Sequence, residues 1–106
     1  MKIKKYSTDD EYLEFDTGDR ITFSHYQDCC EINYADFDQI DDLARHWDFK
    51  APLIFEKVDG CGFRFGNIGR MVFVPCYSAQ NGYYSSDLDI EFNGETVLEL
   101  EDLPIT

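Results

Sequence analysis

The sequence predicts an α+β domain in which a mainly antiparallel sheet of about five to seven strands carries one helix on one face. Short segments of alternating polar and apolar residues recur along most of the chain, which is typical of half-buried strands. A single stretch, 37–47, instead repeats its apolar residues at helical spacing. Hydrophobic residues make up 43% of the 106 residues and aromatic residues 16%, which is enough to build one core. No linker or repeat divides 1–106, so we expect a single domain.

The predicted helix has both a start signal and a stop signal. Asp36 is a suitable N-cap, and Gln39 follows three residues later, as in a capping box. Acidic residues lie near the start and basic residues near the end, where the helix dipole favours each charge. Pro52 prevents any extension. One apolar stripe is formed by Phe37, Ile40, Leu43, Ala44 and Trp47.

The remaining elements are predicted to be strands joined by tight turns. Candidate strands lie at 20–25, 31–34, 53–58, 62–65, 71–74, 83–92 and 97–100. A glycine-bracketed turn at 66–69 joins two of them. Near the start of the chain, Thr8 to Glu11 are expected to cap a helical turn before Tyr12.

The last hairpin permits a prediction of its register. A two-residue loop at 93–94 alone would place Leu88 opposite Glu99 and mix carboxylates into the apolar face. One additional residue pairs Leu88 with Leu100 and Ile90 with Leu98, so that each face stays uniform. We therefore expect a longer loop or a β-bulge, despite the Asn-Gly signal for a two-residue turn.

The charge balance excludes several classes of partner. The chain has 22 acidic and 9 basic residues, a formal net charge of −13, and residues 71–106 contain no Lys or Arg. Direct binding to nucleic acid or to an anionic membrane is not expected, because both carry negative charge. No apolar run is long enough to span a membrane or to form a secretory signal, so we expect a cytoplasmic protein. In that reducing compartment the cysteines are expected to be thiols, with Cys61 and Cys76 acting as small buried hydrophobes.

Two polar segments lie between predicted strands and are candidates for a site. The first, 25–31, reads His-Tyr-Gln-Asp-Cys-Cys-Glu, and the second, 80–86, reads Gln-Asn-Gly-Tyr-Tyr-Ser-Ser. Turns need Asn and Gly, but they do not need adjacent tyrosines and serines. The candidate binding residues are His25, Gln27, Asp28, Cys29, Cys30, Glu31, Asn81, Tyr83, Tyr84 and Ser85.

These segments carry a resemblance to a known family. The pairing of His-x-Gln-Asp-Cys-Cys-Glu with a later Asn-Gly-Tyr-Tyr-Ser, which here includes Gly82, resembles an uncharacterised domain family of bacteria and their phages. The resemblance implies a bacterial cell or a phage-infected host, and it implies that the two segments meet in space. It implies no activity, and residues 51–70 have no counterpart in it.

The first segment contains residue types that suit a metal or a nucleophilic thiol. His25, Cys29 and Cys30 are zinc-type ligands, and Cys76, Cys61 or His46 would complete a set. The candidates for a metal are His25, Cys29 and Cys76. However, adjacent residues of an extended strand point to opposite faces, and the chain has no C-x-x-C pair, so we expect no metal and no other cofactor. A nucleophile at Cys29 or Cys30, with His25 as its base, is the second alternative. The neighbouring carboxylates, Asp28 and Glu31, would raise the pKa of such a thiol, so we expect no enzyme.

A protein-interaction module is the leading hypothesis. Its sharpest form is an inhibitor that mimics nucleic acid, of the anti-defence or anti-CRISPR type, and occupies the basic groove of a nucleic-acid-binding protein. Tyr77, Tyr83 and Tyr84 have the amphipathic character of contact surfaces. The alternatives are a small-ligand, metal or cysteine-dependent site at the two segments, and an accessory structural phage protein. The acidic strip that would bind the partner consists of Asp87, Asp89, Glu91, Glu95, Glu99 and Glu101.

Overall fold

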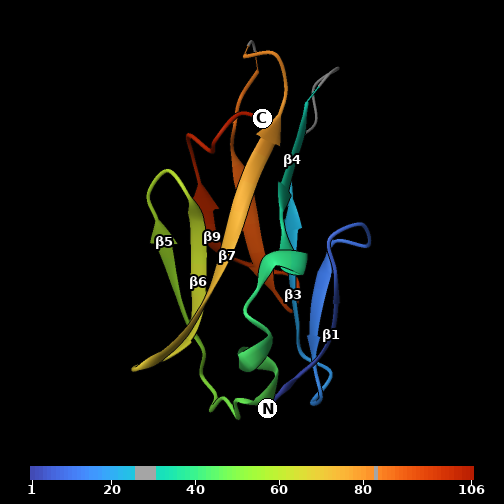
Figure 1. Ribbon diagram of the computed structural model, residues 1–106, viewed down its shortest axis with the longest axis vertical. Helices are drawn as coiled ribbons and strands as arrows, with labels where there is room; N and C mark the ends of the chain where they lie inside the picture. Colours follow the sequence, from blue (N-terminus) through green and yellow to red (C-terminus); the bar gives the residue numbers. More distant parts are fainter. Residues whose placement is uncertain (26–30, 83) are drawn as a thin grey trace.

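Two antiparallel sheets enclose the core in the computed structural model, which describes residues 1–25, 31–82 and 84–106 (Figure 1). The first sheet has the order β1-β2-β3-β8-β9 and the second the order β4-β7-β6-β5. The strands of the first sheet are β1 (Ile3–Ser7), β2 (Tyr12–Phe15), β3 (Arg20–Ser24), β8 (Leu88–Phe92) and β9 (Glu95–Leu100). Those of the second are β4 (Ile32–Ala35), β5 (Ile54–Val58), β6 (Gly62–Asn67) and β7 (Arg70–Ala79).

The predicted α+β class is wrong, because the predicted helix does not form. Residues 37–47 make two 3-10 turns, η1 (Phe37–Gln39) and η2 (Asp42–His46), and the residues between them are extended. The reason is a second cap: Asp36 accepts a hydrogen bond from the Asp38 amide, and Asp41 accepts one from the Leu43 amide. Each aspartate offers the backbone a local bond that competes with a continuous helical ladder. Because the helix is absent, the apolar residues of the predicted stripe do not all face the core, and Leu43 is 64% exposed.

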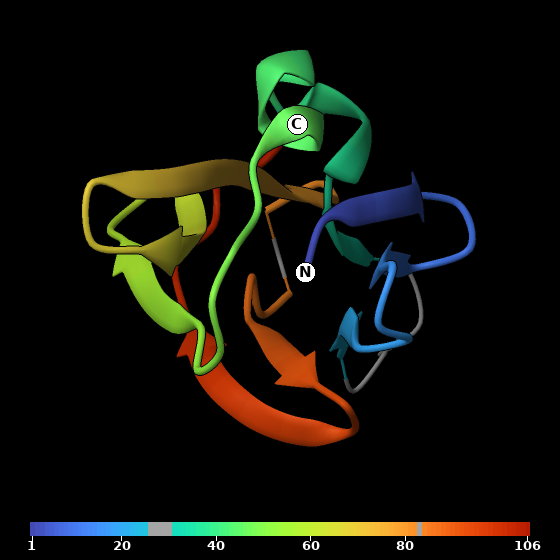
Figure 2. The same cartoon turned by 90° about the horizontal axis from the view of Figure 1, so that it is seen from below.

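The two turns fill a gap between the sheets. β4 pairs with residues 76–79, at the C-terminal end of β7. η1 contacts β7, and both turns also contact β1 (Figure 2). Thr8 anchors this arrangement, because its hydroxyl donates to Asp36 Oδ1 at 3.1 Å and accepts from the Asp38 amide at 3.2 Å. The segment from Thr8 to Glu11 is therefore the turn between β1 and β2, and not the predicted helical turn.

The predicted register of the last hairpin is confirmed. Leu88 faces Leu100 and Ile90 faces Leu98, and the register shifts after Ile90 through a β-bulge. A two-residue turn is also present, because Asn93 and Gly94 have the positive φ angles, 52° and 86°, that a type I′ turn requires. The bulge therefore supplies the additional residue that keeps the apolar side chains on one face.

The core is centred on a cluster of aromatic rings. Phe15, Phe49 and Phe65 contact one another with ring centroids 5.9 to 6.2 Å apart, and all three are buried. Edge-on and tilted contacts of this kind stabilise a pair beyond the burial of its area. Phe49 follows η2 and is held by reciprocal hydrogen bonds of 2.8 Å with the main chain of Met1. The turns thus contribute to the core although they form no α-helix.

Candidate functional site

At one end of the sandwich the inward-facing positions change from apolar to polar. Inward side chains alternate along each strand, so His25 continues the row of Ile21 and Phe23 beyond β3. On β4 and β7 the paired residues Asn33 and Ser78 hold the equivalent positions. Among these polar residues, Glu31, Asn33 and Ser78 are buried, with 1%, 6% and 0% of their surface exposed. Polar groups buried to this degree require hydrogen-bond partners.

Glu31 is paired with the imidazole of His25. Glu31 Oε1 lies 2.9 Å from His25 Nε2. The Asn33 amide nitrogen lies 3.2 Å from the same ring nitrogen, but its two hydrogens are taken by the carbonyls of Ser85, at 3.1 Å, and Asp87, at 2.7 Å. With a carboxylate as its partner, the His25 Nε2–H group therefore donates a hydrogen bond to Glu31 Oε1. A buried carboxylate thus fixes the orientation of the imidazole.

A second set of hydrogen bonds ties the loop before β8 to β4 and β7. The Ser78 hydroxyl donates to Asn33 Oδ1 and accepts from Gln80 Nε2 at 2.6 Å. Gln80 Nε2 also donates to the Ser85 carbonyl at 3.2 Å, and Gln80 Oε1 accepts from the Tyr84 amide at 2.7 Å. These hydrogen bonds have one consistent direction of donation, and they tie the main chain of Tyr84, Ser85 and Asp87 to β4 and β7.

The network brings parts of both sequence segments together. Asn33 contacts His25 of the first segment and Ser85 of the second. Glu31 joins through His25, and Tyr84 joins through its main chain, whereas Asn81 is exposed. Of the other predicted residues, Gln27, Asp28, Cys29, Cys30 and Tyr83 lie outside the described residues.

Sequence reasoning missed Asn33 and Ser78 of this network, and it included Gln80 in the second segment without naming it as a binding residue. The signal for the first two is that a polar residue occupies an inward position of a strand, where an apolar residue is expected. Asn33 stands between the buried residues Glu31 and Ala35, and Ser78 follows the buried Cys76 at the same spacing. Such a position predicts a buried polar residue with dedicated partners.

A cavity of about 200 Å³ lies beside the His25–Glu31 pair. Phe23 and Ile32 supply its apolar lining, and Glu11, Ser24 and Asn33 add polar groups. This volume accommodates a few water molecules or a small polar group. Within 1–25, 31–82 and 84–106, no three His, Cys, Asp or Glu side chains are placed to share a metal ion.

The two cysteines that the structure describes have opposite environments. Cys76 of β7 is fully buried, as predicted, and burial raises the pKa of its thiol to about 12. Cys61 is exposed in the turn between β5 and β6, so the prediction that it is buried is wrong. The Asp59-Gly60 turn that precedes it directs this residue outward, because the turn needs the positive φ of 71° at Gly60.

We expect an alkylating reagent to label Cys61 rapidly and Cys76 only on unfolding. Because the folded pKa of Cys76 is raised, the folded state holds the thiol proton more tightly than the unfolded chain does. The stability that this confers is complete below the ordinary thiol pKa and is lost as pH rises toward about 12. Peptide-level mass spectrometry after iodoacetamide treatment measures both sites. Equal labelling rates in the native protein would contradict this placement.

The acidic strip lies on the outer face of β8 and β9. Asp89 is directly opposite Glu99, with Ser24 of β3 on its other side. Glu91 lies between Thr22 and Thr96, and its carboxylate accepts a hydrogen bond of 3.3 Å from the Thr22 hydroxyl. Among the ion pairs of the described residues, none involves a strip carboxylate.

The remaining strip positions extend this row or leave it. Asp87 and Glu101 continue the same register at its open end and are exposed. Glu95 is opposite Phe92, so the ladder directs it to the other side of the sheet at the hairpin tip. Five carboxylates thus share one face, and the sixth flanks it.

The opposite edge of the same outer face is electrically balanced. Arg20 donates to Glu14 at 2.7 Å and stacks on Tyr12, and Lys4 lies 4.0 Å from the same carboxylate. The hydrogen bond from Arg20 holds the pKa of Glu14 below its ordinary value. The cations that form ion pairs on this sheet therefore lie on β1 and β3, and the negative charges of β8 and β9 form no ion pair among the described residues.

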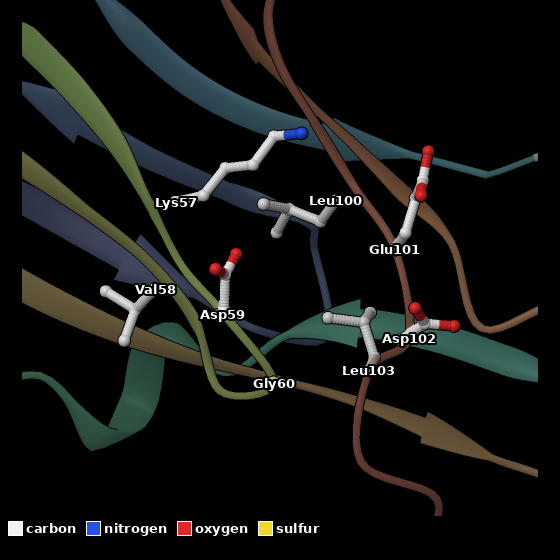
Figure 3. A pocket seen from close by; sticks show the side chains of 9 residues that line it. Lys57, Val58, Asp59, Gly60, Leu100, Glu101, Asp102 and Leu103 are labelled. Atoms are coloured by element: carbon white, nitrogen blue, oxygen red, sulfur yellow. The ribbon is translucent and has the colours of Figure 1, made fainter.

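A second cavity, of about 190 Å³, lies where the strip ends at the seam between β5 and β9 (Figure 3). Leu100 and Leu103 form its apolar part, and Lys57 reaches toward Leu100 from β5. The side chains of Glu101 and Asp102 point away from the centre of this cavity (Figure 3). Lys57 pairs with the buried Phe63 on the inner side of an edge strand. A lysine in that position protects a sheet edge from pairing with another strand, which accounts for the charge of Lys57 without a ligand.

No family model, curated protein or solved structure matches this chain. The described part of the chain contains no helix long and apolar enough to cross a membrane. Fold and surface together define a small acidic β-sandwich with one uncompensated row of carboxylates and one buried polar network.

Proposed function

We propose that this protein is an interaction module whose acidic strip binds a basic surface of a partner protein. The observation that carries the proposal is the pair of Asp89 and Glu99, which lie directly opposite each other and form no ion pair with any cation of the described residues. Like charges at such positions destabilise a sheet. A partner that supplies lysines or arginines converts this cost into binding energy and accelerates association.

The spacing of the strip suits a partner that ordinarily holds a phosphate backbone. Outward residues of one strand recur about every 6.8 Å, and neighbouring strands lie about 4.8 Å apart. The five carboxylates of one face, on two strands, therefore present roughly one charge for every 3 Å of strand, close to the 3.4 Å for each charge of a single DNA strand. The partner class that fits best is a nucleic-acid-binding protein, which the strip occupies in place of its ligand.

A second candidate is a small-ligand site at the cavity beside His25. The observation that favours it is the His25–Glu31 pair, because a buried carboxyl group hydrogen-bonded to an imidazole beside a cavity is an arrangement that functional sites use. A screen of small polar compounds, read from the NMR resonances of the His25 ring, tests this function. Compounds that shift these resonances in wild type and not in Glu31→Gln would support it, and a screen without such shifts would exclude it.

Affinity capture from bacterial lysate tests the leading proposal. The immobilised full chain is exposed to lysate at about 50 mM salt and washed at about 500 mM, which shortens the screening length from roughly 14 Å to roughly 4 Å. We expect proteins with basic nucleic-acid-binding surfaces to be retained first and released by the wash. Capture that resists salt, or that enriches no basic protein, would contradict the proposal.

A further inference from the structure

A hollow lies at the end of the sandwich where the β6–β7 turn meets the segment that leads into β5. Figure 2 looks onto this end and shows that segment running from η2 to the start of β5. The hollow has a volume of about 640 Å³, larger than the two cavities described above and within the range of ligand-binding pockets. The name basic hollow is used below for this site, which is lined by residues 48, 50–52, 54 and 67–70.

Asn67 joins the two walls of the basic hollow. Its side-chain amide accepts a hydrogen bond from the Lys50 main-chain N–H and donates one to the Lys50 carbonyl, both at 2.8 Å. The preceding residue, Phe49, is buried in the core. Gly69 permits the tight turn after Asn67, because it has a φ angle of 83°. The main chain of Lys50 is therefore held in place, and its side chain is left exposed.

The basic hollow is positively charged although the chain as a whole is strongly acidic. Its cations, Lys50 and Arg70, are exposed, and neither forms an ion pair among the described residues. Its carboxylate, Asp48, lies 2.7 Å from the amino group of Met1, which cancels its charge. The carboxylate of the adjoining strand β5 is in an ion pair with β6. Two cations are thus available to a negatively charged ligand.

Arg70 is positioned by the ring of Trp47. Its guanidinium carbon lies 5.8 Å from the centroid of the indole, which is a cation–π contact. A guanidinium stacked in this way keeps N–H groups free at its edge, where its planar fork matches the two oxygens of a carboxylate. The side chain therefore loses little conformational freedom when it binds such a group.

Apolar side chains border the two cations. Ile68, in the β6–β7 turn, is 92% exposed, and Ile54, at the start of β5, is 36% exposed. Ala51 and Pro52 complete the apolar lining. Turns ordinarily carry polar residues, so nothing in the fold itself explains an isoleucine at this position. A ligand with both carboxylates and aliphatic groups would cover the cations and the isoleucines together.

We infer that the basic hollow is a docking site for a short peptide segment of a partner protein, in which acidic and aliphatic residues adjoin. Lys50 and Arg70 receive the carboxylates, and Ile54 and Ile68 receive the aliphatic side chains. A nucleic acid does not fit, because a net charge of −13 repels its dense phosphates and it offers no aliphatic groups. A few carboxylates are attracted locally, since charges more than about 8 Å away are largely screened at physiological ionic strength.

The basic hollow is separate from the acidic strip. The strip lies on the outer face of the first sheet, whereas the hollow is formed by the β6–β7 turn and the segment before β5. The two surfaces select partners of opposite charge, so the inference does not rest on the proposed function. Neutralising the strip should abolish capture of a basic partner without weakening peptide binding, which keeps the failures of the two proposals distinguishable.

Peptide titration of the full chain tests the inference. The probe is a short peptide of alternating glutamate and leucine with both ends blocked. Binding is followed by the emission of Trp47, the single tryptophan of the chain, and by the amide resonances of 67–70. We expect saturable changes in both. The same peptide with glutamine in place of glutamate, and free succinate, should each bind at least about 10-fold more weakly, because each lacks one kind of contact.

Variants of the basic hollow locate the binding. Lys50→Gln and Arg70→Gln should each weaken it by about 5-fold, the upper value for an exposed charge pair. Ile68→Ser should weaken it by about 10-fold through lost apolar contact. The matched controls are Lys57→Gln and Leu43→Ser, which make the same kinds of change at exposed residues outside the hollow. Both should bind as the wild type does, with all folds verified by circular dichroism.

Several results would overturn the inference. One is the absence of a saturable change in both readouts. Another is equal affinity for the glutamine peptide, for succinate or for a single-stranded oligonucleotide, which would show that the hollow does not select an acidic peptide. A third is binding that the three hollow variants weaken no more than the two controls do.

Discussion

Replacing Asp89, Glu91 and Glu99 by Asn, Gln and Gln is expected to lower affinity for the captured partner by about 100-fold, since each charge pair across an interface contributes about 1 kcal/mol. The salt dependence of binding should weaken in parallel, because fewer charges then meet across the interface. Both quantities are measured by titrating the purified partner at several salt concentrations. Unchanged affinity would contradict the assignment of the strip as the binding surface.

The same replacement is expected to leave the fold as stable as the wild type or slightly more stable. Removing the opposed carboxylates of Asp89 and Glu99 relieves a repulsion of roughly 0.2–1 kcal/mol. A gain in stability together with a loss of binding separates a functional surface from a structural one. Chemical denaturation of the variant measures this difference, and a marked loss of stability would show that the strip has a role in folding.

The matched control neutralises three exposed carboxylates away from the strip. Asp9→Asn, Asp10→Asn and Asp38→Asn together change the formal charge from −13 to −13 + 3 = −10, as the strip variant does. None of these side chains lies on β8 or β9. Binding close to that of the wild type is expected. If this control loses as much affinity as the strip variant, net charge and not the strip determines binding.

Replacing Asn33 by Leu is expected to destabilise the protein by about 2–4 kcal/mol, because three buried or partly buried groups lose a partner. The Ser78 hydroxyl loses its acceptor, and the carbonyls of Ser85 and Asp87 lose the amide donor. The loop before β8 should loosen, and hydrogen exchange should become faster there than in the core. Because that loop ends at Asp87, partner binding should weaken as well.

Ser78→Ala provides the comparison for this prediction. It removes one hydroxyl from the network but keeps the bonds from Asn33 to the two loop carbonyls. Its expected cost is about 1 kcal/mol, the usual net value of one hydrogen bond. Denaturant unfolding measures both variants. If Asn33→Leu costs no more than Ser78→Ala, then the Asn33 amide does not position the loop.

Much of the sheet structure was predictable because strand alternation and turn chemistry are local signals. The pairing of Leu88 with Leu100 followed from keeping apolar residues on one face, and the structure confirms it. The strands β1 and β2 were not predicted, because Lys4, Lys5 and the acidic turn before Tyr12 obscure the alternation. Their partners become evident only when β3 and the core are in place.

The helix prediction was wrong for a specific physical reason. The spacing of apolar residues in 37–47 is compatible with an α-helix. However, this spacing gives no information about capping residues inside the segment that favour two short turns instead. Asp41 restarts the hydrogen bonding in the middle of the segment, and Thr8, distant in sequence, holds the Asp36 and Asp38 end. Such a tertiary contact overrides a local preference.

The candidate site was predictable only in part. The segments containing His25 and Ser85 stood out by composition, but their meeting point, Asn33, lies in a predicted strand with an unremarkable local sequence. The charge of the strip was evident from the sequence. The direct opposition of Asp89 and Glu99 depended on the register and became certain only in the folded sheet.

Competition with nucleic acid tests the central claim most directly. A fluorescent oligonucleotide bound to the captured partner is titrated with the wild-type protein, and its anisotropy is followed. We predict complete displacement at equivalence, with the Asp89, Glu91 and Glu99 variant requiring about 100-fold more protein, in proportion to its lost affinity. A ternary complex, in which the oligonucleotide stays bound while this protein binds the same partner, would contradict the claim that the strip takes the place of a phosphate backbone.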